Sequence, residues 1–110
     1  MPLPVDRILS EVDRAAGESV DFAARLVRIP TVNPPGEEYE ACANAIGDQL
    51  RAHSADVHLL PAIGKAEHTA RHPRINVVGR YEGAVTGPAI HLNGHFDVVR
   101  LLKVFLLTKI

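Results

Sequence analysis

The chain has 110 residues, of which 46% are hydrophobic and 23% charged, and its formal net charge is -1. This length fits one small domain or a piece of a larger one, and the composition is ordinary for a soluble globular protein. A near-neutral charge argues against a nucleic-acid partner, because proteins that bind nucleic acids usually show a clear basic excess. The apolar stretch at residues 101–110 is too short for a membrane-spanning helix, which needs about 20 residues. We therefore expect neither a nucleic-acid nor a membrane partner.

Cysteine usage and the first residues of the chain indicate a cytoplasmic protein. Cys42 is the single cysteine, so no internal disulfide can form. Residues 1–7 lack the basic region and apolar core that begin a signal peptide. Cys42 falls on the apolar stripe of a predicted helix, which favours a small buried residue over a reactive thiol.

Apolar residues recur at helical spacing from residue 5 to residue 27, with an interruption at Gly17. This pattern predicts one kinked helix or two abutting helices, ending near Ile29. Residues 31–36 form a predicted loop, since proline and glycine disfavour helix there. A further helix is predicted over residues 37–53. Its apolar stripe consists of Tyr39, Cys42, Ala43, Ile46 and Leu50.

Three strands are predicted to follow, at residues 56–60, 74–81 and 89–92. Residues 63–73 read as a surface loop, and residues 83–88 as a turn or short loop between the last two strands. Helices followed by strands suit an open α/β sheet. Active sites in such sheets lie beyond the carboxyl ends of the strands.

The third predicted strand leads directly to His95 and Asp97, the most informative pair in the sequence. Side chains two residues apart in an extended backbone project to the same face. This arrangement suits a metal-binding imidazole with a carboxylate that orients it. A bare His-x-Asp is weak evidence, but the apolar run before it and the valines after it strengthen the signal. His91 lies one pleat away, where it is either a structural histidine or a neighbour of the site.

Other polar residues allow two interpretations each. Glu37, Glu38 and Glu40 could form a metal cluster, although a solvated helix start explains them. The loop at residues 33–36 could contact a substrate, or it could simply separate two helices. The remaining histidines have no ligand-like spacing and read as surface residues. They are His53, His58, His68 and His72.

Residues 26–40 and 91–99 together resemble the acetylornithine deacetylase and succinyl-diaminopimelate desuccinylase type of zinc hydrolase. The wider family includes aminoacylases and metal carboxypeptidases, and residues 73–80 also fit its pattern. The resemblance implies hydrolysis of N-acyl amino acids or peptide-like amides, using two zinc or cobalt ions bridged by a carboxylate and a water. Carried over by position, His95 would be a metal ligand, and Asp97 the catalytic carboxylate that orients it.

From Arg100 onward the chain departs from the family pattern. The family's other metal ligands, its catalytic glutamate and its dimerisation domain have no counterpart. We therefore expect residues 1–99 to be the truncated amino-terminal part of an open-sheet zinc-hydrolase catalytic domain, and residues 100–110 a divergent apolar tail. One imidazole cannot hold a catalytic zinc, which takes three protein ligands, so metal occupancy and activity of this chain alone are not expected.

Two further possibilities remain from the sequence. The chain could be a non-catalytic binding protein or pseudoenzyme that associates with a full-length relative, or the product of a degraded gene. For the truncated fragment, uncovered apolar helix faces, an uncovered sheet edge and the apolar tail predict self-association.

Overall fold

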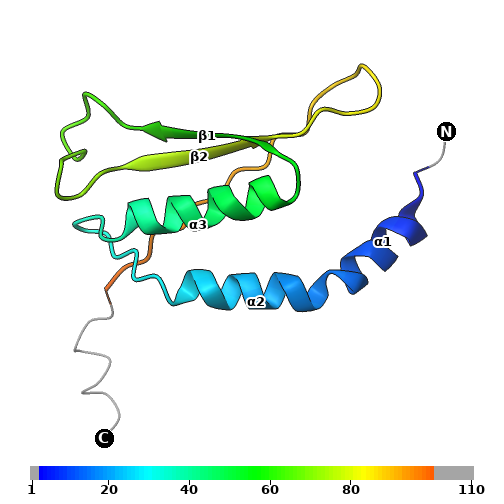
Figure 1. The fold of residues 1–110 in the computed structure, drawn as a ribbon, viewed down its shortest axis with the longest axis horizontal. Coiled ribbons are helices and arrows are strands. Elements are labelled where there is room, and N and C mark those ends of the chain that lie inside the picture. Colours follow the sequence, from blue (N-terminus) through cyan, green and yellow to red (C-terminus); the bar gives the residue numbers. More distant parts are fainter. Residues whose placement is uncertain (1–2, 101–110) are drawn as a thin grey trace, which may run out of the picture.

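The computed structural model describes residues 3–100. They form the helices α1 (Val5–Arg14), α2 (Ala16–Val27) and α3 (Tyr39–Ala52), followed by the strands β1 (Asp56–Pro61) and β2 (Ile75–Arg80). In Figure 1, α3 lies between the sheet and α2, and α1 extends away from this layered part. The predicted α/β class is confirmed at this level, as helices followed by strands.

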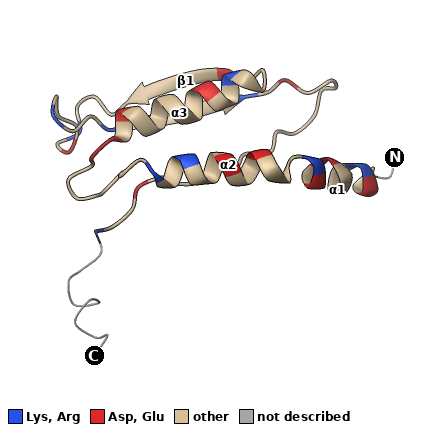
Figure 2. Cartoon of the chain, turned by 60° about the horizontal axis from the view of Figure 1, so that its bottom comes forward, with Lys and Arg blue, Asp and Glu red and all other residues tan. Residues whose placement is uncertain are grey.

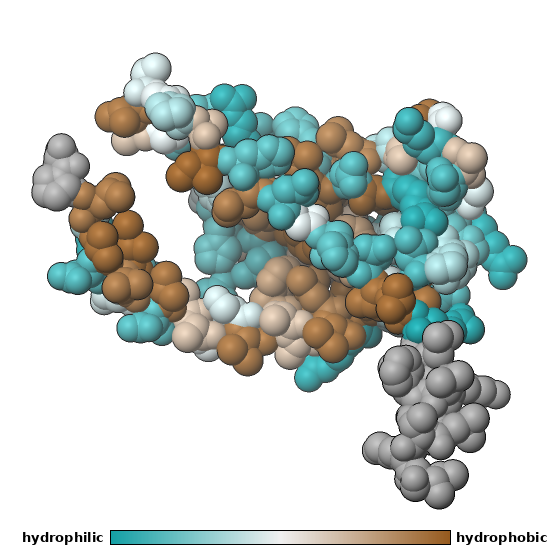
Figure 3. Space-filling view, turned by 180° about the vertical axis from the view of Figure 1, so that it is seen from behind, coloured by the Kyte–Doolittle hydropathy of each residue, from teal (hydrophilic) through white to brown (hydrophobic). Residues whose placement is uncertain are grey.

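The first helical region is two abutting helices, one of the two predicted forms. The break falls at Ala15, before Gly17, and α2 ends slightly before the predicted Ile29. Neither helix buries a residue. Figure 3 shows apolar side chains following one another along α1. The large ones that remain half exposed or more are Val5, Ile8, Leu9 and Val12.

The third helix, α3, supplies most of the buried side chains. It begins at Tyr39 rather than at residue 37, because Glu38 has a left-handed backbone (φ 56°) that a right-handed helix cannot include. Cys42 and Ala43 are 1% and 0% exposed, so the predicted burial of Cys42 is confirmed. The predicted apolar stripe is thus the face that α3 turns toward the sheet.

The two strands form an antiparallel pair in which Asp56 lies opposite Arg80 and Pro61 opposite Ile75. Both strands match their predicted ranges to within a residue at each end. The helix α3 packs on one face of this pair, and it approaches closely at Gly79. A Cβ there would lie 2.9 Å from Leu50 Cδ1, so the absence of a side chain makes room for Leu50.

The third predicted strand, at residues 89–92, is wrong. No strand forms between residues 81 and 97, and the side chains of Ile90 and Leu92 are 89% and 88% exposed. An apolar run becomes a strand only when a neighbouring strand satisfies its backbone groups, and this segment has no such neighbour. Within residues 3–100 the sheet therefore has two antiparallel strands in place of the three predicted.

Charges of both signs are interspersed along α1 and α2 (Figure 2). Among the described residues, no helix is long and apolar enough to cross a membrane. The predicted apolar tail lies outside the described residues, except for Arg100.

Candidate functional site

The side chains of His95 and Asp97 are in contact, as their spacing of two residues predicts, within a segment that has no regular secondary structure. His95 Nδ1 lies 2.8 Å from Asp97 Oδ1 and 3.2 Å from the backbone oxygen of Asp97. The imidazole side chain is 84% exposed and the carboxylate 34%. Because a carboxylate accepts hydrogen bonds, this contact favours the tautomer with hydrogen on Nδ1. The lone pair of Nε2 is then free on the outer side of the ring.

The backbone around this pair is joined to the loop that precedes α3. Thr31 Oγ1 donates a hydrogen bond to the carbonyl oxygen of Phe96 at 2.7 Å. The amide of Val98 donates to the carbonyl of Thr31 at 2.9 Å, and the amide of Asn33 donates to the carbonyl of Val98 at 2.8 Å. Thr31 is only 2% exposed. Residues 96–98 are thus fixed to residues 31–33, although His95 does not follow a strand.

Asn33 also contacts the carboxylate directly. Its Nδ2 donates to Asp97 Oδ2 at 3.2 Å, while the other carboxylate oxygen faces His95. The hydrogen bond from Asn33, and to a smaller extent the contact with His95, lowers the pKa of Asp97 below its ordinary value. Asp97 is therefore ionised at neutral pH, as an orienting carboxylate must be.

An arginine and two aromatic rings complete the surroundings of Asn33. Arg74 Nη2 donates to Asn33 Oδ1 at 3.1 Å and to the carbonyl oxygen of Pro35 at 2.9 Å. The Arg74 guanidinium lies 5.1 Å from the centre of the Tyr39 ring, and this ring meets Phe96 edge-on at 5.2 Å. Burial raises the pKa of the Tyr39 hydroxyl, which keeps it protonated.

A hollow of about 840 Å³ lies beside the pair. It is bounded by residues 74–79 on one side and by residues 91–97 on the other, with Leu26 of α2 and Ile46 of α3 contributing. His91 is exposed and lines the hollow, as His95 does. Its exposure argues against a buried structural histidine.

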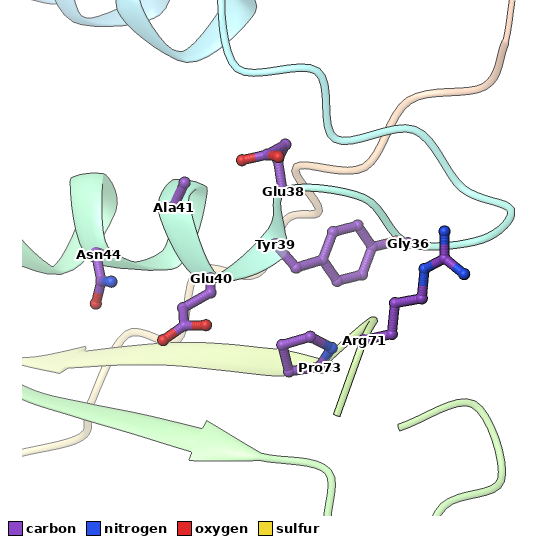
Figure 4. A pocket seen from close by; sticks show the side chains of 8 residues that line it. All are labelled: Gly36, Glu38, Tyr39, Glu40, Ala41, Asn44, Arg71 and Pro73. Carbon is purple, nitrogen blue, oxygen red and sulfur yellow. The ribbon is translucent and has the colours of Figure 1, made fainter. Parts of the chain in front are cut away.

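A second hollow, of about 400 Å³, lies at the start of α3. Its lining includes Glu38, Glu40, Asn44 and Arg71 (Figure 4). The side chains of Glu38 and Glu40 point away from one another in this view. They do not converge on a common point, which supports the interpretation as a solvated helix start.

The residues that could hold a metal are few. Within residues 3–100, no group of three or more histidine, cysteine, aspartate or glutamate side chains is placed to hold a metal ion. A catalytic zinc takes three protein ligands. The described residues supply one candidate for such a ligand, His95, together with the carboxylate that orients it. His53 contacts Glu18 at 2.7 Å and His58 contacts Asp56 at 3.2 Å, both on the surface as predicted.

Sequence reasoning missed Thr31, Asn33 and Arg74 as parts of this arrangement. Asn33 and Asp97 are 64 positions apart in the sequence, and Asn33 and Arg74 are 41 apart. No local periodicity links residues at such separations. The one available signal is the polar loop at residues 33–36, whose composition allows a substrate contact but does not indicate a contact with Asp97.

Comparisons of the chain with known protein families, with curated proteins and with solved structures find no match. The assignment of roles to His95 and Asp97 therefore depends on the sequence resemblance and on the geometry described above.

Proposed function

We propose that the chain forms the amino-terminal part of the catalytic domain of a metal-dependent amide hydrolase that acts on N-acyl amino acids or peptide-like amides. In this proposal His95 is a zinc or cobalt ligand and Asp97 is the carboxylate that orients it. One observation carries the proposal: Asp97 holds Nδ1 of His95 at 2.8 Å and leaves Nε2 exposed. Metal-ligating histidines almost always place their second nitrogen on such a partner.

A bound zinc or cobalt ion would lower the pKa of its water and polarise the amide carbonyl. In this proposal the residues of this chain bind the metal through His95 and orient that histidine. Asp97 holds the His95 ring in one orientation and raises its basicity, and Asn33 keeps the carboxylate in place through its second oxygen. The ligands that would complete the site are not among the described residues. We therefore expect the chain alone to be inactive.

Activity is tested with N-acetyl amino acids and simple dipeptides in the presence of zinc or cobalt. The expected result is no turnover above the metal-only control, because one imidazole cannot hold a catalytic ion. Metal-dependent turnover that disappears in His95→Ala would show that this chain completes the site by itself.

The role of His95 and Asp97 is tested by titrating the chain with zinc, with NMR of the imidazole nitrogens as the readout. Zinc is expected to bind weakly, and at His95 through Nε2. Asp97→Ala should weaken that binding about 10-fold, since it removes the orienting partner. Asp56→Ala is the matched control, because Asp56 contacts a different exposed histidine, His58. Equal effects of the two variants on zinc at His95 would contradict the proposal.

A second candidate function is non-catalytic binding, with a full-length relative as partner. The half-exposed apolar side chains along α1 favour it, because contiguous exposed apolar surface marks interaction sites. The coding DNA beyond codon 99 separates the candidates. Another reading frame that encodes Gly-Arg-Gly, then Asp-Met-Lys and later Glu-Glu-Gly would support the enzyme. Absence of these motifs from all frames would favour a binding protein.

A further inference from the structure

Arg74 immediately precedes β2 and reaches across to the loop before α3. Its Nη2 alone makes two hydrogen bonds, to Asn33 Oδ1 at 3.1 Å and to the Pro35 carbonyl at 2.9 Å. The Cζ atom of the guanidinium lies 5.1 Å from the centre of the Tyr39 ring, a cation–π distance. On another side is Gly36, where a Cβ would lie 2.9 Å from Arg74 Cζ. These contacts hold the guanidinium in one position.

This position determines the orientation of the Asn33 amide. A side-chain amide accepts with its oxygen and donates with its nitrogen, whereas a guanidinium only donates and a carboxylate only accepts. With Oδ1 against Arg74, Nδ2 faces Asp97 Oδ2 at 3.2 Å. The reversed amide would place two donors together at Arg74 and two acceptors together at Asp97. Arg74 therefore selects which end of Asn33 meets the carboxylate.

We propose that Arg74 is a positioning residue for His95. Through Asn33 it holds Asp97 so that Oδ1 accepts the Nδ1 hydrogen of His95, which leaves Nε2 unprotonated and outward. The value of a free Nε2 as a metal ligand rests on the proposed function. The chain of contacts from Arg74 to His95 exists without any metal, so it can be tested separately.

The test is the tautomer of His95 in the metal-free chain, read from the imidazole nitrogen shifts in long-range proton–nitrogen NMR above the pKa of the ring. Wild-type His95 is expected to carry hydrogen on Nδ1. Arg74→Met keeps an apolar stem but removes the donors, and should shift the His95 tautomer balance toward that of exposed His91. Arg71→Met is the matched control, since Arg71 is a nearby exposed arginine. It should leave the His95 tautomer unchanged.

Two further variants protect the test against misfolding, which the amide signals of β2 would reveal. Asn33→Ala removes the middle contact while Arg74 stays, and should cause the same tautomer shift as Arg74→Met. The double variant should shift no further, because both changes break one chain of contacts. Arg74→Lys should keep the wild-type tautomer, because a single nitrogen makes both contacts of Arg74 with the loop.

A folded Arg74→Met or Asn33→Ala chain with the wild-type tautomer would overturn the proposal. So would a folded Arg74→Lys chain that has lost this tautomer. If Arg74→Met does not fold, Asn33→Ala and Arg74→Lys decide the question between them. An intact tautomer response combined with equal effects of Asp97→Ala and Asp56→Ala on zinc at His95 would reject the proposed function and leave the positioning role of Arg74 standing.

Discussion

The unit formed by α3, β1 and β2 and the segment at residues 81–95 contain similar apolar residues, yet they bury them very differently. In the first, elements adjacent in sequence pack together and cover Cys42 and Ala43 almost completely. In the second, Ile90 and Leu92 stay about nine-tenths exposed (89% and 88%). An apolar pattern therefore predicts burial only when a nearby element supplies the opposing surface.

The candidate site lies where the second region joins the rest of the molecule. Residues 96–98 are bonded to residues 31–33, whereas residues 90–94 are exposed. His95 follows the exposed residues directly, and its ring is oriented by Asp97 from the bonded side. The geometry of the pair thus depends on a few long-range hydrogen bonds and not on a strand beneath it.

The largest expected effect is in the packed unit. Ala43→Leu adds three carbons to a side chain that is 0% exposed, and should lower the free energy of unfolding by about 1–3 kcal/mol through overpacking. Thermal unfolding followed by circular dichroism measures this loss. Ala41→Leu is the control, since Ala41 is exposed on the same helix. Equal losses in the two variants would mean that α3 does not bury the Ala43 face.

An effect of comparable size is expected at Gly36, which lies in the loop that contacts Arg74. Gly36 has φ +100°, and an added Cβ would lie 2.9 Å from Arg74 Cζ, so Gly36→Ala should cost about 1–3 kcal/mol. Gly64 also has positive φ (+88°), but no atom lies within 4 Å of its Cβ position. Chemical denaturation of Gly36→Ala and Gly64→Ala should show the larger loss in Gly36→Ala. A larger loss in Gly64→Ala would argue against close packing of Arg74 on the loop.

Thr31→Val should have an effect of about 1 kcal/mol, and it should act locally. The valine has the same shape but cannot donate to the Phe96 carbonyl, which then loses its partner. We expect faster hydrogen exchange at the amide of Val98 with little change in β2. Thr69→Val is the control, because Thr69 lies in a surface turn and contacts His72. Unchanged exchange at Val98 in Thr31→Val would show that this hydrogen bond does not hold the segment.

Acid should weaken the contact between Asp97 and Asn33, which also joins residues 96–98 to the loop. The pKa of Asp97 is lower in the folded chain than in the unfolded chain, because Asn33 donates to the carboxylate. The resulting stabilisation is present above the unfolded pKa and is lost as the pH falls through the folded pKa. The amide signals of Asn33 followed from pH 6 to about pH 2 should show this loss. Asp97→Asn should remove the transition, and an identical transition in that variant would assign it to another group.

The smallest effect is expected in the exposed segment. Ile90→Ser should change the free energy of unfolding by no more than about 0.5 kcal/mol, because Ile90 is 89% exposed. Chemical denaturation of this variant beside Ala43→Leu compares the two regions directly. A loss above about 2 kcal/mol would show that Ile90 packs as a core residue, as in the predicted strand.

The sequence predicted the unit of α3, β1 and β2 better than it predicted the segment at residues 81–95. The apolar stripe of α3 and the ranges of β1 and β2 depend on local periodicity, and they were confirmed. The contact between His95 and Asp97 was predicted from their spacing of two residues and is present, although the strand expected before them is not. The predicted strand at residues 89–92 does not form, because the described residues offer it no neighbouring strand, and its own residues could not show this.

The contacts that support the His95–Asp97 pair could not be predicted from the sequence, because they join residues that are far apart in it. Asn33 and Arg74 meet because the turn before α3 and the start of β2 come together in space. Asn33 then reaches Asp97, which is 64 positions away. Such contacts have no signature in spacing or composition, so the roles of Asn33 and Arg74 emerged only from the structure.

Hydrogen exchange at single amides tests most directly whether residues 96–98 are held on the loop beside His95. The amide of Val98 donates to the Thr31 carbonyl and that of Asn33 to the Val98 carbonyl, so both should be protected. The amide of Leu92, in the exposed segment, should exchange at the rate of an unstructured peptide. If Val98 exchanges as fast as Leu92, the His95–Asp97 pair is not held in place and the proposed orientation of the imidazole is wrong.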